Sequence, residues 1–351
     1  MAYTTINKGS LYMNTVLWTG NSSTQAVTGV NFQPNWTWIK CRNDAQEPRL
    51  VDSVRGTTKY LDASLAIAEL TDTNILTSFD TDGFTLGDDA ISNYSGNTMV
   101  GWNWKAGGTA SSNTDGSITS SVSANTTAGF SVVTWTGTGA NATVGHGLGS
   151  VPKMIILKNR DSAENWIVGH NSLGWTKYLT LNTTDSVSTA SNIWQDTTPT
   201  SSVFSIGASG KVNGSTHGMV AYCFAEKKGF SKFGSYVGTG SSTGTPFIYT
   251  GFKPAFVMTK ISSGTSDDWT MTDIVRDNAV GGGNGTGARL QANYNGAEAV
   301  NTTYASIQKY SNGFSPQGNL NVTNGSGYTY IYMAFAENPF VGSDGTPVTA
   351  R

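Results

Sequence analysis

One pattern occurs three times along this sequence. In each occurrence a proline opens a run of apolar residues that ends on a lysine six positions later. The three pairs are Pro34 and Lys40, Pro152 and Lys158, and Pro254 and Lys260. An internal repeat of this kind constrains the architecture before any local pattern is considered. It also bears on function, because a single catalytic site would be found in one copy, whereas a structural or binding role can be shared by all three.

Further landmarks extend the repeat in both directions. Upstream of each proline an aromatic residue stands two positions before a glycine, and downstream a phenylalanine precedes a strand-like run that closes on an aromatic residue. The glycines are Gly20, Gly137 and Gly238, the phenylalanines are Phe84, Phe204 and Phe314, and the closing residues are Trp104, Phe224 and Phe335. We define repeat 1 as residues 11–106, repeat 2 as 129–228 and repeat 3 as 229–340, with an N-terminal arm at 1–10 and a C-terminal tail at 341–351.

The stretch between repeats 1 and 2, residues 107–128, consists mostly of Gly, Ser, Thr and Asn. A segment with so few large apolar side chains cannot bury enough surface to become ordered by itself. The sequence therefore predicts a flexible linker at 107–128. Repeats 2 and 3 follow each other almost directly, so we expect them to pack as a fixed pair and repeat 1 to move more freely.

Composition favours strands over helices. The chain of 351 residues has 42 glycines and only 13% charged residues, and it is rich in Ser, Thr and Asn, which suits short strands joined by turns. The spacing of 118 residues from Lys40 to Lys158 and of 102 from Lys158 to Lys260 is large enough for a domain. The sequence predicts an all-β fold of three tandem homologous antiparallel β-sandwich or jelly-roll-like domains. The one helical candidate is 61–70, in repeat 1 only.

Several classes of function are disfavoured by the sequence. A net charge of −2 gives no concentrated basic surface for nucleic acid, and no apolar run reaches the roughly 20 residues of a membrane span. Cys41 and Cys223 stand at unrelated places in repeats 1 and 2, which gives neither a disulfide framework nor a metal-ligand spacing. Two half-buried thiols are the simplest interpretation, and an intermolecular bridge is the alternative. We expect no metal and no cofactor.

Charged residues at the spacing Asp-x-x-Arg follow the lysine in two of the repeats. The pairs are Asp52 with Arg55 and Asp273 with Arg276, and repeat 2 has His170 and Leu173 in their place. A carboxylate three residues from a guanidinium predicts a local ion pair that holds a turn and contributes little where it is exposed. An acid with an electrostatic helper, as in a hydrolase, is the alternative. The change in repeat 2 argues against shared catalysis, so we expect no catalytic residue.

Two other motifs also lack the context that a site requires. The histidines, His146, His170 and His217, fit no metal-ligand spacing, and we expect them in turns or on the surface. The glycine-rich stretch at 281–287 is similar to a phosphate-binding loop only in its glycine content, because no Lys-Ser or Lys-Thr follows it. It predicts a surface loop.

The tryptophans allow both core and surface roles. Some lie inside the repeated strand patterns and are expected in cores, whereas Trp175, Trp194 and Trp269 lie beside polar, turn-rich stretches. Exposed rings on a β-sandwich can stack against sugar rings while neighbouring polar side chains bond the hydroxyls. We therefore name these three as candidate contacts for a glycan or receptor, with burial in a core as the alternative.

Several stretches resemble a known family of repeats. "GFKPAFVMTK", "VGHGLGSVPKMIILKNR", "LVDSVRGTTKYL" and "YIYMAFAENPF" look like the repeats of virion structural proteins of marine tailed bacteriophages, cyanophages included, which are often described as tail-fibre-like. The resemblance extends from about Leu11 to Phe340. It implies a β-rich part on the external surface of a virus particle, made in the host cytoplasm. The family has no agreed catalytic motif, so the resemblance names no catalytic residue.

The resemblance also implies partners. These are other virion proteins of the tail adaptor or the capsid, further copies of the chain in a homo-oligomer such as a trimer, and a glycan or protein of the host surface. Two functions stay open: a tail fibre or tail-tip component for host recognition, and a capsid decoration or head-fibre protein with a purely architectural role. A depolymerase is disfavoured because no paired carboxylates recur at related positions.

Overall fold

The computed structural model describes residues 4–277, 287–300 and 307–339. It confirms the all-β expectation, because strands make up nearly all of the regular structure and each helix is a single turn. The predicted C-terminal tail at 341–351 lies outside the described residues. So does the predicted surface loop at 281–287, apart from Gly287.

Three large antiparallel sheets share one strand order. In repeat 1 the order is β1 (Met13–Thr19), β9 (Thr98–Trp104), β3 (Trp36–Cys41), β4 (Arg49–Asp52), β5 (Lys59–Asp62) and β6 (Leu70–Thr71). In repeat 2 the matching strands are β12 (Phe130–Thr136), β19 (Gly218–Ala225), β14 (Pro152–Asn159), β15 (Ile167–His170), β16 (Lys177–Thr180) and β17 (Ser188–Thr189). In repeat 3 they are β20 (Ser231–Val237), β28 (Thr329–Ala336), β22 (Pro254–Ile261), β23 (Thr270–Asp273), β24 (Ala288–Gln291) and β25 (Ala299–Val300). The equal order agrees with the sequence repeat, while common ancestry stays a prediction of the sequence.

A smaller sheet accompanies each large one. The small sheets are β2 (Gln25–Thr28), β8 (Gly83–Leu86) and β7 (Ser78–Asp80) in repeat 1, β13 (Ala142–Gly145) and β18 (Val203–Ile206) in repeat 2, and β21 (Ile248–Tyr249), β27 (Gly313–Pro316) and β26 (Ile307–Tyr310) in repeat 3. The helical turns are η1 (Gly9–Leu11), η2 (Asn171–Leu173), α1 (Ser191–Trp194), α2 (Gly210–Asn213) and α3 (Asn321–Asn324).

The large sheets are apolar on both faces, and β14 shows why. Met154 and Ile156 belong to a core shared by all three repeats, whereas Ile155 and Leu157 belong to a second core beneath the small sheet of repeat 2. Successive side chains of a strand point to opposite faces, so a continuous apolar run is what a strand covered on both sides requires. Each repeat is therefore a sandwich-like unit whose inner face meets those of the other two.

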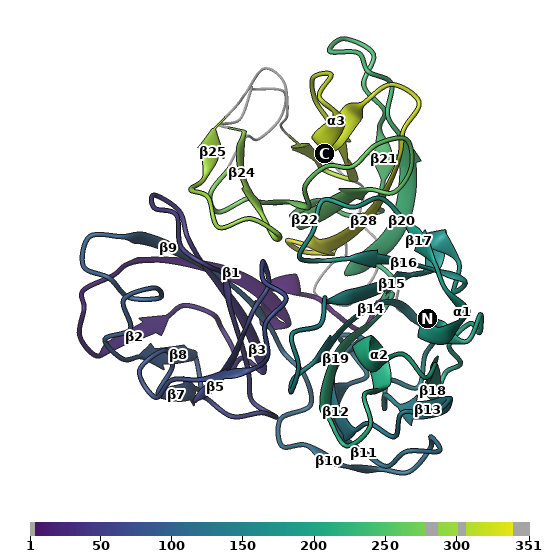
Figure 1. Ribbon diagram of the computed structural model, residues 1–351. Coiled ribbons are helices and arrows are strands. Elements are labelled where there is room, and N and C mark those ends of the chain that lie inside the picture. The colour runs from purple at the N-terminus through teal and green to yellow at the C-terminus, as the bar shows by residue number, and fades with distance from the viewer. Residues whose placement is uncertain (1–3, 278–286, 301–306, 340–351) are drawn as a thin grey trace.

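The three closing aromatic residues meet at the centre of the molecule. The ring centroids of Trp104 and Phe224 are 6.4 Å apart, those of Trp104 and Phe335 6.0 Å, and those of Phe224 and Phe335 6.1 Å. One residue from each repeat thus forms a nearly equilateral triangle, around which the three lobes are arranged (Figure 1). The described chain forms a closed ring of three units with approximate threefold symmetry.

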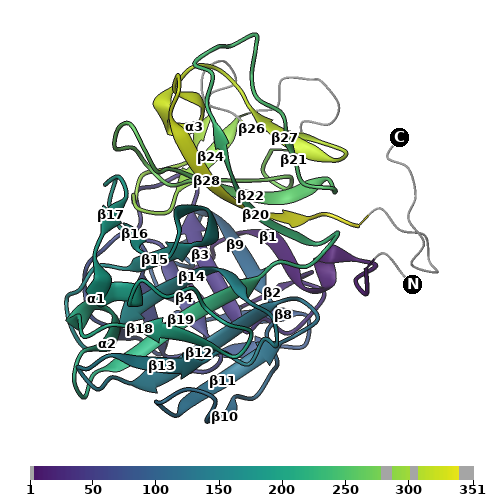
Figure 2. The same ribbon diagram turned by 90° about the vertical axis from the view of Figure 1, so that its right-hand side faces the viewer.

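The prediction of a flexible linker at 107–128 was wrong. This segment contains β10 (Ser111–Asn113) and β11 (Ser120–Asn125), which extend the large sheet of repeat 2 to eight strands. Ile118 and Val122 are buried in the core beneath the small sheet. In both views the two strands lie at the outer edge of the lobe of repeat 2 (Figures 1 and 2). Two well-placed apolar side chains and edge pairing with β12 order a segment that composition alone describes as too polar to fold.

The expected freedom of repeat 1 was wrong as well. Its backbone is joined to both neighbours, since the amide of Glu69 donates to the carbonyl of Arg160 and the amide of Glu298 donates to the carbonyl of Arg42, each at 2.7 Å. The predicted helix at 61–70 is also absent. Its first residues belong to β5, and Leu61 and Ala63, two positions apart as in a strand, are both buried in the shared core.

Candidate functional site

The Asp-x-x-Arg pair of repeat 1 is buried and saturated with hydrogen bonds. Asp52 ends β4 and accepts bonds from the amides of Val54 and Arg55 at 3.0 and 2.9 Å, which close the turn that follows the strand. It also accepts from Nε of Arg55 at 2.5 Å and from the hydroxyl of Tyr222, in repeat 2, at 2.8 Å. The predicted local ion pair is therefore present, but it lies inside the molecule rather than on the surface.

A second carboxylate extends this pair across the boundary between repeats 1 and 2. Glu69, just before β6, accepts from Nη1 of Arg55 at 2.9 Å and from Nη2 of Arg160 at 2.7 Å. Burial alone would raise the pKa of Glu69, but the bonds from Arg160 and Arg55 hold it below its usual value. We call this set junction 1–2: Asp52, Arg55, Glu69, Arg160 and Tyr222.

The boundary between repeats 3 and 1 repeats this arrangement. Asp273 accepts from Nε of Arg276 at 2.6 Å and from Nε1 of Trp102, in repeat 1, at 3.0 Å. Glu298 accepts from Nη1 of Arg276 at 2.8 Å and from Nη2 of Arg42 at 2.9 Å. Burial alone would raise the pKa of Asp273, but Arg276 keeps it below its usual value. These five residues are junction 3–1.

The boundary between repeats 2 and 3 has different chemistry at the same positions. His170 ends β15, and its Nδ1 accepts from the amide of Ser172 at 3.1 Å while its Nε2 lies 3.2 Å from the carbonyl of Tyr332. A carbonyl can only accept, so the proton is on Nε2 and the ring is neutral. Burial lowers the pKa of His170 to about 4. Junction 2–3 consists of His170, Leu173, Val187, Ser262 and Met333, and Met333 matches Tyr222 because each stands two residues before the closing aromatic residue of its repeat. The two aliphatic side chains pack against the shared core.

The sequence did not predict that histidines are buried, because its motifs favoured a place in turns or on the surface. His146 is fully buried as well, and its Nδ1 accepts from the amide of Leu148 at 3.2 Å. Burial lowers its pKa. In both imidazoles Nδ1 accepts from a backbone amide that closes a local turn and Nε2 donates to a backbone carbonyl, so both ring nitrogens already have partners.

The three framework lysines are all buried, and their ammonium groups donate to backbone carbonyls. Lys40 reaches Tyr294 of repeat 3 at 2.7 Å, and Lys260 reaches Thr184 of repeat 2 at 2.7 Å. Lys158 donates to Glu164 within its own repeat. Desolvation lowers the pKa of each lysine to about 8. The prolines and phenylalanines of the framework are buried too, so the sequence landmarks mark the interior.

Trp175, Trp194 and Trp269 are buried, so the interpretation as core residues is correct and the candidate glycan contact is wrong. Trp175 and Trp194 pack edge to face with centroids 5.4 Å apart, above Gly169, where a Cβ atom would lie 2.5 Å from the ring of Trp175. Trp269 donates from Nε1 to the carbonyl of Thr180 at 2.9 Å, which links repeats 3 and 2.

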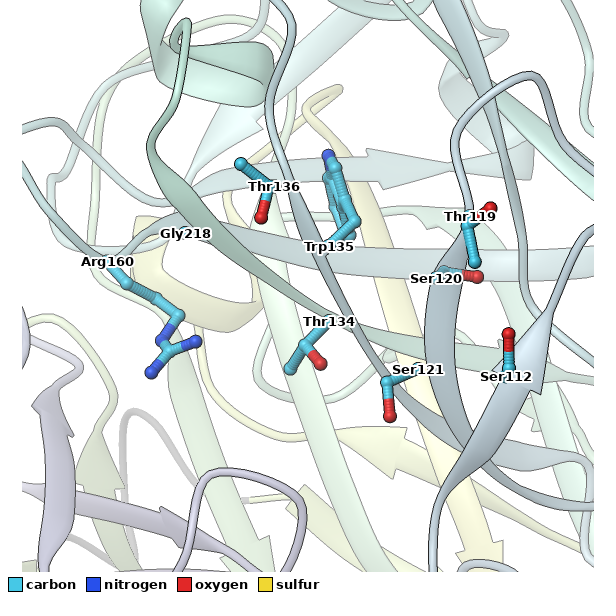
Figure 3. A pocket seen from close by; sticks show the side chains of 9 residues that line it. All are labelled: Ser112, Thr119, Ser120, Ser121, Thr134, Trp135, Thr136, Arg160 and Gly218. Carbon is cyan, nitrogen blue, oxygen red and sulfur yellow. The ribbon is translucent and has the colours of Figure 1, made fainter.

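An accessible polar site is found instead beside β10 and β11. A groove of about 390 Å³ opens there, and hydroxyl side chains dominate its lining (Figure 3). The lining residues are Ser112, Thr119, Ser120, Ser121, Thr134, Trp135, Thr136, Arg160 and Gly218. We call it the hydroxyl groove.

Strand register explains how the hydroxyl groove is assembled. Ser112 pairs with Ser121, and Ser121 pairs with Thr134, so three hydroxyls stand in one row across β10, β11 and β12. Arg160 borders this row in Figure 3, with its guanidinium committed to Glu69 of repeat 1. The ring of Trp135 packs on the other face against Phe204, with centroids 5.7 Å apart. The groove can therefore exchange hydrogen bonds with a polar ligand but offers it little apolar contact.

The position of Ser121 could have revealed this site. Ser121 is partly exposed between the buried Ser120 and Val122, as in a strand with one face toward solvent. The polar composition of the whole stretch outweighed this short signal in the sequence interpretation.

Within 4–277, 287–300 and 307–339 there is no group of three or more His, Cys, Asp or Glu that could hold a metal ion. Over the same ranges no helix has the length and apolar character needed to cross a membrane. Cys41 and Cys223 are both free and buried, and this argues against an intermolecular bridge.

Fold and site together define an all-β protein of three sandwich-like units closed around one core, with a polar groove at its edge. The chain belongs to the family described as a domain of unknown function (DUF7483), whose match covers residues 8–339. No curated protein matches the chain. Because the family description carries no activity, the function has to be argued from the geometry.

Proposed function

We propose that this protein is an external structural protein of a bacteriophage particle, a tail fibre or tail-tip component that displays its β-lobes for recognition of a host surface. The supporting observations are the resemblance of the repeats to phage virion proteins and the contrast between interior and edge. The interior landmarks recur in all three repeats, whereas the hydroxyl groove is built on β10 and β11, which have no counterpart in the described residues of repeats 1 and 3.

The hydroxyl groove is the observation that carries the recognition role. Its row of hydroxyls, Ser112, Ser121 and Thr134, can donate and accept hydrogen bonds, as a surface glycan or a polar peptide requires. Because the strands beneath it are fixed by pairing to the central sheet, a ligand would meet a preformed surface and little ordering would be lost on binding.

Cell binding tests this proposal. Fluorescently labelled protein is added to cells of marine bacteria, cyanobacteria included, and the same unlabelled protein is used to compete with phage infection. We expect saturable binding to susceptible cells, and we expect Ser121→Val with Thr134→Val to weaken it by about tenfold through the loss of two hydrogen bonds. Absence of binding by the unmodified protein at micromolar concentration would contradict the recognition role.

A capsid decoration or head-fibre protein with an architectural role is the second candidate. The triangle of Trp104, Phe224 and Phe335 favours it, because a body with approximate threefold symmetry can sit on a threefold axis of a shell or on a trimeric partner. A reconstruction of the virion that places the chain on the head, without contact with the tail, would favour this candidate over the first.

A further inference from the structure

A cluster of exposed aromatic rings lies on the outer sheet of repeat 3. Phe247 is 52% exposed and Tyr249 is 64% exposed, and Tyr310 beside them is partly exposed. They belong to or border β21 and β26, which lie together with β27 in Figure 2. The opposite face of the same sheet carries the buried side chains of Ile248 and Phe314. We call Phe247, Tyr249 and Tyr310 the aromatic platform.

Strand register holds these rings in place. Tyr249 pairs with Gly313, and Gly313 pairs with Tyr310, so a residue without a side chain separates the two tyrosines. The ring of Phe247 occupies the space above this glycine, since a Cβ atom at Gly313 would lie 2.8 Å from its Cζ. Phe247 and Tyr310 meet edge to face, with centroids 5.7 Å apart. The platform is therefore packed before any ligand arrives.

The equivalent positions of the other repeats carry no rings. Ile248 corresponds to Val27 and Val144, because each pairs with the framework phenylalanine of its repeat. The residues that match Phe247 and Tyr249 are therefore Ala26 and Thr28 in repeat 1 and Thr143 and Gly145 in repeat 2. The fold accepts small residues at these positions, so the rings of repeat 3 are not needed to build the sheet.

Uncharged polar groups surround the platform. The hydroxyl of Tyr310 donates to Oε1 of Gln308 at 2.7 Å, and the hydroxyl of Ser315, which pairs with Gln308 across the strands, bonds to Thr245 at 2.8 Å. Aromatic faces next to amides and hydroxyls match the two surfaces of a sugar ring, its C–H face and its hydroxyl edge. We propose that the aromatic platform binds an uncharged saccharide, which stacks on Phe247 and Tyr249.

The size of the platform favours a saccharide over a protein partner. A stable protein interface buries about 800 Å² on each partner. An aromatic side chain buries about 150–250 Å² when it is fully covered, and the two most exposed rings are here already about half covered. The remaining area suits one or two sugar rings. This inference deepens the proposed recognition role and rests on it for its biological context.

Titration calorimetry with the full chain tests the inference. The probes are cellohexaose, maltohexaose, laminarihexaose and chitohexaose as uncharged saccharides, with hexagalacturonate as the charged comparison. The variant is Phe247→Ala with Tyr249→Thr, which installs the residues of repeat 1 on the same sheet position. Tyr94→Ala, which removes a ring of repeat 1 that is 53% exposed, is the matched control, and circular dichroism checks that both variants keep the native fold.

We expect the unmodified protein to bind at least one uncharged hexasaccharide more tightly than hexagalacturonate. The platform variant should weaken that affinity by about tenfold or more, and the Tyr94→Ala control should leave it unchanged. Binding of none of the four uncharged saccharides, or equal affinity of the platform variant, would overturn the inference. Cell binding separates the two proposals. Unmodified protein that binds cells but none of the four uncharged saccharides defeats the inference alone, whereas unmodified protein that binds saccharide but no cells defeats the recognition role.

Discussion

Two of the three junctions between the repeats are ionic, and the third is not. Junctions 1–2 and 3–1 each bury an aspartate, a glutamate and an arginine that joins them, with a second arginine at the edge. Junction 2–3 places a neutral histidine, two aliphatic residues and a serine at the same positions. The geometry around the last residue of β4, β15 and β23 is nevertheless the same, because Asp52, His170 and Asp273 all accept from the amide two residues later.

We infer from this comparison that the four charged positions of an ionic junction depend on one another. A buried ion pair contributes little over an apolar packing of similar shape, whereas half of an ion pair is strongly destabilising. Junction 2–3, which has none of the four charged residues, is consistent with this coupling.

The largest effect is expected when the central guanidinium is removed alone. Arg55→Leu leaves Asp52 and Glu69 buried without their common partner, and we expect a loss of about 3–5 kcal/mol in the free energy of unfolding, measured by urea denaturation. Arg276→Leu in junction 3–1 is the matched variant and should give a similar loss. A loss below about 1 kcal/mol in both would show that the junctions do not depend on their ion pairs.

Replacing the whole set should restore most of that loss. Asp52→His, Arg55→Leu, Glu69→Val, Arg160→Ser and Tyr222→Met together give junction 1–2 the residues found at the matching positions of repeats 2 and 3. We expect this fivefold variant to be more stable than Arg55→Leu by about 2 kcal/mol, because no charge is left unpaired. If it is instead less stable than the single variant, the junctions are not interchangeable units.

Acid should affect the two junction types over different pH ranges. The pKa of His170 is about 4 in the folded chain against an ordinary 6.5, so between these values the unfolded chain binds a proton that the folded chain does not, and stability falls as the pH is lowered. Glu69 and Asp273 have lowered pKa values, so their contribution is present above their ordinary values of 4.5 and 3.8 and is lost below them.

The variant His170→Asn separates these two ranges. The amide oxygen of the asparagine can still accept from the amide of Ser172, but this side chain does not take up a proton in this pH range. Urea denaturation at several pH values should therefore show a smaller loss of stability between pH 6.5 and 4, with part of the slope remaining because burial also lowers the pKa of His146. The loss below pH 4 should be unchanged. An unaltered slope between pH 6.5 and 4 would exclude His170 as a contributor.

The smallest effect is expected at the edge of the ionic junctions. Arg42 and Arg160 keep 24% and 23% of their side-chain surface exposed, and the glutamate that each contacts is also held by a buried arginine. Arg42→Ala or Arg160→Ala should cost about 1 kcal/mol in the free energy of unfolding, with stronger dependence on salt than for the buried pair. If either variant lost as much stability as Arg55→Leu, the partly exposed arginines and not the buried ones would provide most of the stabilisation of the junctions.

The fold class could be predicted from the sequence because it depends on local signals. The apolar runs from Pro152 to Lys158 and at the matching positions specify strands covered on both sides, and the turn-rich composition specifies short antiparallel pairs. What the sequence did not reveal are contacts between repeats. Trp269 has polar neighbours in sequence, but it is buried and donates to Thr180 of repeat 2, and the amide of Asp267 donates to Thr184 of the same repeat.

For the candidate sites, too, local signals could be predicted from the sequence and contacts between distant residues could not. The ion pair of Asp52 and Arg55 could be predicted from its spacing, whereas its burial could not, because Tyr222 and Arg160 come from another repeat. The hydroxyl groove and the aromatic platform depend on strand register across three neighbouring strands, which no single stretch of sequence specifies.

Scanning calorimetry of the full chain tests the central claim, that three lobes closed around one core form a single cooperative body. We predict one transition whose calorimetric enthalpy equals its van't Hoff enthalpy. Trp104, Phe224 and Phe335 pack against one another, so unfolding of one repeat would expose the closing aromatic residues of the other two to water. Two separated transitions, with repeat 1 melting apart from repeats 2 and 3, would contradict the closed ring.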